Sequence, residues 1–160
     1  MQARNAGDSM TAPALEISCD PGRLDLAAIH QYLSLESGWA RGISVELVAR
    51  SIEHSLCFGA YLGQQQIGFA RVISDHATFA NLVDVYVLQQ FRGRGYSKQL
   101  MQAVIAHPQL QGLRRFTLAT ADAHGLYAQF GFTAVAKPQS YMERYDPDVY
   151  RGRGAGSATQ

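Results

Sequence analysis

The sequence predicts a single α/β domain built on a mixed β-sheet. Three observations lead to this prediction. The 160 residues are 47% hydrophobic and 17% charged, which suits one globular domain with its own core. The hydrophobic pattern has a helical period early in the chain and a strand period in its middle. Towards the C-terminus, helical and strand patterns alternate.

In chain order, a weak strand at 14–18 comes first and two amphipathic helices follow. Leu26, Ile29 and Leu33 have helical spacing in the first helix, and Ser44 is a suitable N-cap for the second. The loop between the helices contains glycine, tryptophan and arginine. A loop at this place can reach over the sheet that follows.

The period then changes to two residues, which predicts three antiparallel strands joined by short turns. We expect these strands at 56–62, 67–74 and 78–87. Alternation along the third strand places Leu82, Asp84 and Tyr86 on one face and three valines on the other.

The last third of the chain alternates between helix and strand. The expected order is a helix stopped by Pro108, a strand, a helix with Gly131 as its C-cap, and two final strands. These elements are expected at 96–106, 114–120, 121–130, 132–136 and 140–145.

Composition limits the class of protein. We expect one domain at 14–146, between flexible segments at 1–13 and 147–160 that are rich in small and polar residues. A net charge of +1 argues against a general nucleic-acid binder. Cys19 and Cys57 lack metal-ligand spacing, and no stretch has the pattern of a signal peptide or a membrane span. We therefore expect a cytoplasmic protein with reduced cysteines and no metal.

The motif RGRG occurs twice, with different surroundings. The copy at 92–95 lies between an expected strand and an expected helix, so the free N–H groups and the dipole of the helix favour an anion there. Its glycines allow a phosphate to approach, and its arginines add positive charge. The copy at 151–154 has neither element beside it, and we expect it to belong to the flexible tail.

The first copy does not fit the commonest phosphate loops. Lys98 stands where a dinucleotide fingerprint needs its third glycine, and the sequence contains no Walker A motif. By itself, the loop fits a ligand site and a simple connecting turn equally well.

The run VDVYVLQQFRGRGYSKQLM, followed by ADAHGLYAQFGF, resembles the GNAT superfamily of N-acetyltransferases. Residues 90–95 match its Q/R-x-x-G-x-G/A signature for acetyl-CoA, and residues 123–132 match its A-x-x-L-Y-x-x-x-G-F segment. The resemblance extends over residues 14–146 in element order. It implies a GNAT-like fold, with helices on both faces of a mixed six- to seven-stranded sheet and with strands 4 and 5 splayed apart.

The resemblance also implies acetyl-CoA (coenzyme A) as co-substrate. Its pantetheine arm would lie between the splayed strands, its pyrophosphate would bind the loop amides, and one fourth-strand amide would face the thioester carbonyl. Thr120 stands where the family usually has Asn, and its hydroxyl could replace that hydrogen bond. The other expected cofactor-binding residues are Val85, Tyr86, Val87, Gln90, Arg92, Gly93, Arg94, Gly95, Tyr96 and Ser97.

Two catalytic residues are expected for direct attack by an amine in a ternary complex. Tyr127 occupies the position of the family's acid, which protonates the leaving thiolate. Asp84 is the first candidate for the base, because a carboxylate in an apolar strand is costly unless it is paired or used. Each has a structural alternative: Tyr127 could pack on the sheet, and Asp84 could pair with Arg71.

The acceptor is expected to be a primary amine of a small molecule, since no acidic run suits a polybasic partner. An arginine with aromatic residues would fit an amine that carries a carboxylate. Trp39 could equally be a core residue, and His124 a surface residue. The residues expected around the acceptor are Trp39, Arg41, Arg71, Asp75, His76, Phe79 and His124.

Other interpretations stay open. A GNAT-like domain could bind an acyl-CoA or an amine as a sensor without turnover. An RNA-binding module using both RGRG copies is disfavoured by the charge and by the lack of an RNP-like aromatic pattern. An edge strand at 140–145 could pair two copies into a homodimer.

Overall fold

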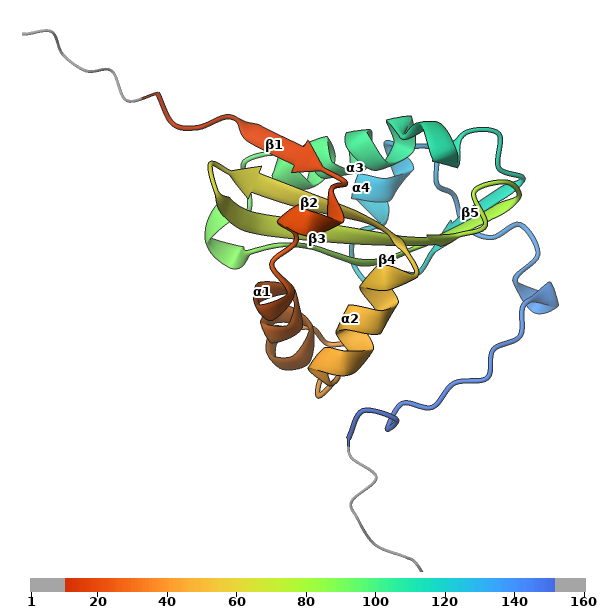
Figure 1. Cartoon of the computed structure of the whole chain (residues 1–160). Coiled ribbons are helices and arrows are strands. Elements are labelled where there is room, and N and C mark those ends of the chain that lie inside the picture. Colours follow the sequence, from red (N-terminus) through yellow and green to blue (C-terminus); the bar gives the residue numbers. More distant parts are fainter. Residues whose placement is uncertain (1–10, 152–160) are drawn as a thin grey trace, which may run out of the picture.

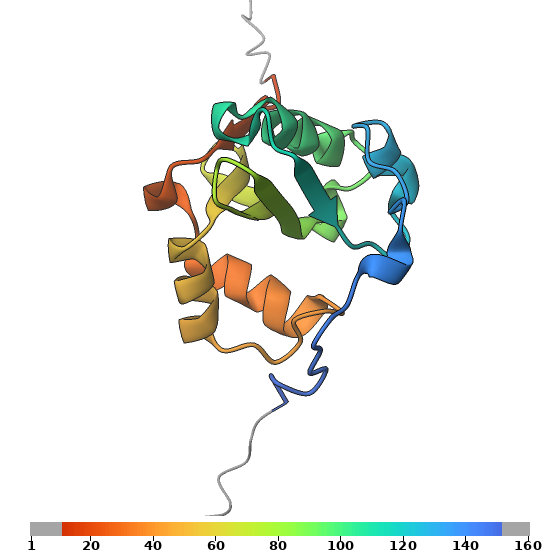
Figure 2. The ribbon, with the colours of Figure 1, turned by 90° about the vertical axis from the view of Figure 1, so that its right-hand side faces the viewer.

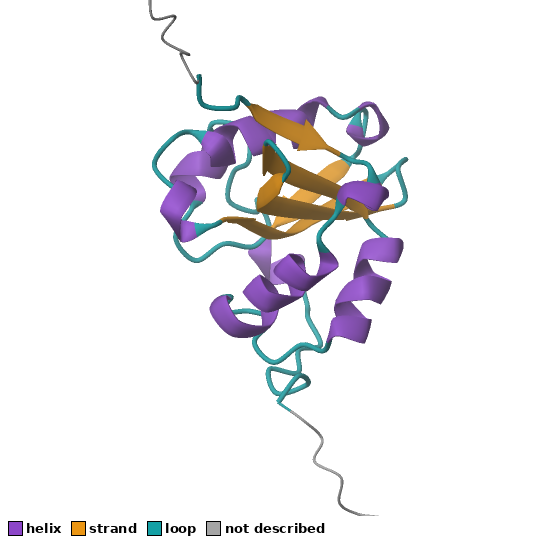
Figure 3. Cartoon of the chain, turned by 60° about the vertical axis from the view of Figure 1, so that its left-hand side comes forward, coloured by secondary structure: helices purple, strands orange, loops and turns teal. Residues whose placement is uncertain are grey.

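One mixed sheet separates two layers of helices in the computed structural model, which describes residues 11–151. Helices α1 and α2 lie on one face of the sheet, and α3 and α4 lie on the other (Figure 1; Figure 3). The helices are α1 (Leu26–Gln31), α2 (Val45–Glu53), α3 (Tyr96–Ala106) and α4 (His124–Ala128). The prediction of an α/β domain with a mixed sheet is confirmed.

The sheet of the described residues has five strands in the order β1-β2-β3-β4-β5. The first four are antiparallel neighbours, and β5 runs parallel to β4. The strands are β1 (Leu15–Ser18), β2 (Leu56–Leu62), β3 (Gln65–Ser74), β4 (Phe79–Val87) and β5 (Arg115–Leu118).

Side-chain caps fix the starts of the first two helices. The carboxylate of Asp25 accepts the N–H of Ala28 at 2.9 Å, and the hydroxyl of Ser44 accepts that of Leu47 at 3.3 Å. Helix α1 continues into one π-helical turn, Tyr32–Glu36, which buries its first three residues. Such turns are frequent at functional sites.

The sheet has a hydrophobic core on each face. Phe58, Leu100 and Met101 are fully buried on the side of α3, whereas Ile29 and Phe69 are fully buried on the side of α1 and α2. Burying one such side chain contributes about 1.5–3 kcal/mol to stability.

Strand β4 contains a bulge where its pairing with β5 ends. The parallel pairing stops at Leu82, although β4 continues to Val87, and Figure 2 shows the two strands opening apart. On the β3 side, the single residue Ala70 stands opposite two residues of β4, Asp84 and Val85, so β4 carries one extra residue. Asp84 lies there with φ 53°, a left-handed conformation that non-glycine residues seldom adopt.

The bulge corrects the predicted alternation along this strand. Leu82 and Val85 pack with the core under α3, whereas Tyr86 packs with the core under α1 and α2. The prediction that Leu82 and Tyr86 share one face is therefore wrong, because one inserted residue shifts the period of two.

The two final strands predicted at 132–136 and 140–145 are not strands, so the sheet of the described residues has five strands instead of six to seven. Phe132 contacts β5 by ring packing on Phe116, at 5.4 Å between centroids. Further on, Met142 is 98% exposed, so the apolar pattern of this stretch is not buried against the sheet. The suggested homodimer through an edge strand at 140–145 loses its basis.

The C-terminal end of the described chain returns to the loop between α1 and α2 (Figure 1). Tyr150 packs against the core on the α1–α2 side. A β-carbon at Gly42 in that loop would lie 2.9 Å from the carbonyl oxygen of Tyr150. Tyr150 belongs to the first part of the segment 147–160, which the sequence predicted to be a flexible tail. The second RGRG begins at Arg151, and its other residues lie outside the described residues.

Candidate functional site

The glycine loop after β4 leaves the start of α3 open. Gly93 and Gly95 have φ 75° and 79°, and Gly95 is the N-cap of α3, where no side chain caps the helix. The first-turn N–H groups of an uncapped helix, together with its dipole, favour an anion. The loop thus has the backbone geometry expected of a phosphate site.

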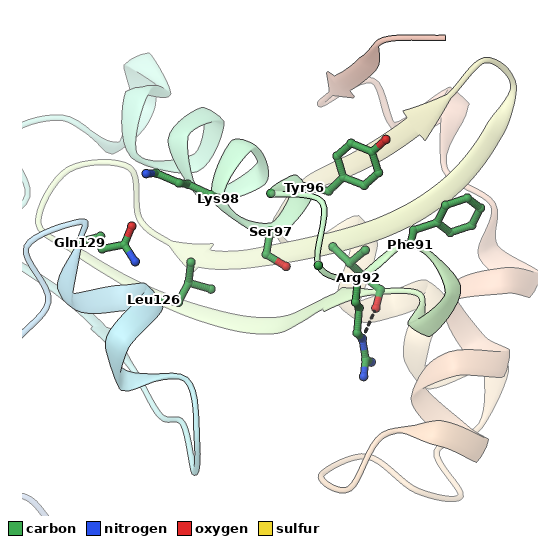
Figure 4. A pocket seen from close by; sticks show the side chains of 10 residues that line it. Phe91, Arg92, Tyr96, Ser97, Lys98, Leu126 and Gln129 are labelled. Atoms are coloured by element: carbon green, nitrogen blue, oxygen red, sulfur yellow. Dashed lines mark hydrogen bonds between the residues drawn. The ribbon is translucent and has the colours of Figure 1, made fainter. Parts of the chain in front are cut away.

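A cavity of about 180 Å³ lies in front of these N–H groups (Figure 4). It is bounded by the end of β4, the glycine loop, the first turn of α3, and α4. The lining residues expected from the sequence are Val87, Arg92, Gly93, Gly95, Tyr96 and Ser97. The lining residues that sequence reasoning missed are Phe91, Lys98, Leu126 and Gln129.

The two arginines of the loop differ in their contacts. Arg92 donates from Nε to the carbonyl of Val87 at 2.8 Å and from Nη2 to the hydroxyl of Tyr32 at 3.2 Å. It thereby ties the loop to the α1 side of the sheet. Arg94 is exposed, with its guanidinium carbon 6.0 Å from the ring centroid of Phe91. Gln90, just before the loop, is also exposed and does not line the cavity.

A second cluster centres on Asp84 at the bulge of β4. Its Oδ2 accepts from Arg71 Nε at 2.8 Å and its Oδ1 accepts from Trp39 Nε1 at 2.9 Å. Arg71 also donates from Nη1 to the hydroxyl of Ser55 at 3.1 Å. The Asp84 side chain is only 9% exposed, so the predicted pairing with Arg71 exists as a nearly buried ion pair.

Aromatic rings extend this cluster. Tyr32 stacks on Tyr86 at 3.7 Å between ring centroids and lies 6.5 Å from Trp39. Burial raises the pKa of Tyr86, so its phenol is protonated at neutral pH. Trp39 itself is 54% exposed and is not a core residue.

Helix α4 carries the predicted acid. Tyr127 is buried and packs edge-on against Phe132. Burial, aided by the charge of Asp122, raises the pKa of Tyr127, which keeps its proton on the phenol. Thr120 accepts the N–H of Ala123 at 3.0 Å and so holds the turn that leads into α4.

The remaining predicted site residues do not line the cavity and make no hydrogen bond to Asp84. Asp75 is in the turn between β3 and β4, and Phe79 is the first residue of β4, at the opposite end of that strand from the glycine loop. The hydroxyl of Thr78 and three backbone N–H groups donate to Asp75, which holds the pKa of its carboxyl well below its usual range. His76 is exposed in the same turn, and Arg41 and His124 are exposed elsewhere. Asp75 therefore stabilises the turn.

Residues 11–151 contain no group of three or more His, Cys, Asp or Glu side chains that could hold a metal ion. None of their helices has both the length and the apolar character that crossing a bilayer requires.

Comparison with known proteins gives consistent results. Residues 53–134 match the family model of the acetyltransferase (GNAT) domain. A protein of Gibberella zeae assigned as an acetyltransferase is 30% identical over 135 residues, which are 71% of this chain and 75% of that protein. A crystal structure from Xanthomonas campestris pv. campestris, assigned to the GNAT family, is 58% identical with a TM-score of 0.85. That match covers 89% of this chain and 100% of the other.

A more distant structure has the same fold. It is a GNAT family acetyltransferase from Elizabethkingia anophelis, solved with acetyl-CoA bound. It is 16% identical with a TM-score of 0.57, over 81% of this chain and 86% of that one.

Proposed function

Because the chain belongs to the GNAT family of acetyltransferases, we propose that it transfers the acetyl group of acetyl-CoA to a primary amine of a small molecule. The observation that supports this most directly is the uncapped start of α3, which faces a cavity of about 180 Å³. A pyrophosphate suits those N–H groups, and Lys98 and Arg94 are exposed beside them. The distant relative with acetyl-CoA bound supports the same donor.

The bulge of β4 supports a role in polarising the acyl carbonyl. Asp84 and Val85 have no register partner on β3, and the pairing with β5 has already ended at Leu82. We infer that a backbone N–H in this stretch donates to the carbonyl oxygen of a bound thioester. Removing such a donor costs about 10²–10³ in rate in enzymes where it has been tested.

We assign the proton transfers to Asp84 and Tyr127. Acetyl-CoA supplies the acetyl group as a thioester. Asp84 would take a proton from the acceptor's ammonium group, and the neutral amine would form the C–N bond as the C–S bond breaks. Tyr127 would give its proton to the leaving sulfur and regain one from the attacking nitrogen. The products are an amide, a free thiol and one proton.

The test of this function is ligand-dependent stability followed by turnover. Acetyl-CoA at 100 times its Kd should raise the free energy of unfolding by about 2.7 kcal/mol, and RNA should not. Thiol release with a panel of small amines then measures transfer. Stabilisation without thiol release for any amine would favour the sensor interpretation, and no stabilisation would refute the proposal.

Gly95→Ala should weaken acetyl-CoA binding about tenfold and destabilise the fold by about 1–2 kcal/mol. At φ 79° a β-carbon is strained, so the loop must shift and its N–H groups turn away from the cavity. Isothermal calorimetry and thermal unfolding measure the two effects. The matched control is Gly112→Ala, where φ is 70° in a loop outside the cavity, which should lose stability but keep its affinity for acetyl-CoA.

We also propose a cytoplasmic location. Cys19 and Cys57 are both free thiols in the structure, which is typical of proteins in reducing compartments.

A further inference from the structure

Trp39 is an exposed residue in a fixed position. The hydroxyl of Ser37 donates to the carbonyl of Leu33 at 2.6 Å and accepts the N–H of Ala40 at 3.1 Å, which holds the loop around it. The indole N–H is bound to Asp84, while more than half of the side chain is open to solvent. A large aromatic surface that is both exposed and held in place is suited to contact with a ligand.

The hydrogen bond between these residues sets the distance from the indole to any amine bound at Asp84. Trp39 Nε1 lies 2.9 Å from Oδ1 of Asp84. An ammonium group that also binds this oxygen sits about 2.7–2.9 Å away from it. The carbons attached to the amine therefore lie within reach of the indole, and Tyr32 extends the aromatic surface beyond it.

The charges at the cluster discriminate against a carboxylate next to the amine. The two arginines that contact the cluster already have partners: Arg71 donates to Asp84 and Ser55, and Arg92 donates to Val87 and Tyr32. A carboxylate on the neighbouring carbon of the acceptor would face Asp84 as a like charge. In the segment around Trp39, the exposed Glu36 and Arg41 carry opposite charges, so the segment adds no net charge to the cluster.

We propose that the acceptor is a primary amine on a flat apolar or aromatic body, with no carboxylate beside the amine, and that Trp39 selects it. This inference rests on the proposed acetyltransferase function and narrows its substrate class. This acceptor class differs from the one expected from the sequence, which was an amine that carries a carboxylate. The structure disfavours that amine because Arg71 is already paired with Asp84.

Three probes separate the features of the acceptor: 2-phenylethylamine, L-phenylalanine and butylamine. With saturating acetyl-CoA, kcat/KM for 2-phenylethylamine should be about tenfold or more above that of either other amine. Trp39→Ala should lower kcat/KM for 2-phenylethylamine about tenfold more than for butylamine, since losing the indole N–H to Asp84 affects both amines, and should leave stabilisation by acetyl-CoA unchanged. Leu35→Ala, an exposed apolar residue of the same segment, should change none of these values.

Binding is measured without turnover as well. Trp39 is the single tryptophan of the chain, so its fluorescence should change saturably with 2-phenylethylamine in the presence of coenzyme A. The concentration that gives half of the fluorescence change should be at least about tenfold higher for L-phenylalanine than for 2-phenylethylamine. Saturable binding without turnover would overturn the proposed reaction but support this acceptor class.

Three results would overturn the inference itself. They are a preference for L-phenylalanine that Arg41→Ala abolishes, an equal loss for all amines in Trp39→Ala, and no fluorescence change with 2-phenylethylamine. If 2-phenylethylamine causes no fluorescence change but other amines give thiol release, the proposed transferase function is still supported.

Discussion

Asp84→Asn is expected to lower kcat by about 10²–10⁴-fold, the usual contribution of a general base. An alkylammonium with a pKa near 10.4 is neutral in only about one part in 10³·⁴ at pH 7, so the loss of its proton acceptor should be felt strongly. Asparagine tolerates the left-handed backbone at φ 53° and keeps an oxygen for the indole N–H of Trp39. Steady-state thiol release measures the effect.

The same substitution should also lower stability. Arg71 would keep its charge in a largely buried place without a carboxylate partner, which costs about 3 kcal/mol or more. Urea unfolding measures this loss, and kinetics are recorded where the variant is fully folded.

Arg71→Gln separates the two roles of Asp84. This variant breaks the same ion pair but retains the carboxylate, so it should lose comparable stability and keep kcat within about tenfold of the unmodified protein. If both variants lose activity equally, Asp84 acts only as a structural partner of Arg71.

Tyr127→Phe should lower kcat about 10²-fold, at the lower end for a general acid because a thiolate is a good leaving group. The phenyl ring retains the packing against Phe132, so the free energy of unfolding should change by no more than about 1 kcal/mol. Binding of acetyl-CoA should also be unchanged. Thiol release, calorimetry and thermal unfolding measure these three quantities.

The control for this variant is Tyr145→Phe, an exposed tyrosine outside the cavity, which should behave as the unmodified protein. Because burial raises the pKa of Tyr127, this phenol should not cause a fall of kcat between pH 7 and pH 9. Full activity in Tyr127→Phe would contradict its assignment as the acid.

The parts of the fold that the sequence predicted well have local signals. The sequence of strands β2 to β4 alternates with a period of two, and α3 begins directly after Gly95 and ends shortly before a proline. The GNAT resemblance, which rested on two short motifs, is confirmed by the family model and the relatives. The glycine loop lies beside a cavity because its position depends only on the elements next to it in the chain.

The bulge of β4 has no such signal. The sequence of residues 82–87 alternates without interruption. The residue with the left-handed backbone is Asp84, so no glycine indicates the bulge. The one hint is a carboxylate within an apolar strand, whose cost is offset by Arg71 and Trp39 from distant segments. A register shift of this kind depends on tertiary packing, which the local pattern does not contain.

The missed and misplaced site residues have similar causes. Leu126 and Gln129 line the cavity because of how α4 packs against the start of α3, which no local pattern specifies. Asp75 was expected near the acceptor, but its oxygens are used by its own turn. The last two strands were expected from apolar residues that the structure leaves largely exposed.

The contact between Gly42 and Tyr150 has a consequence for how the protein matures. The loop that carries Trp39 is synthesised before the segment around Tyr150, which follows it by more than 100 residues in the sequence. Domains generally fold as units. The loop of the proposed acceptor site can therefore reach its final packing only after residue 150 has been translated, and a shorter nascent chain lacks this contact.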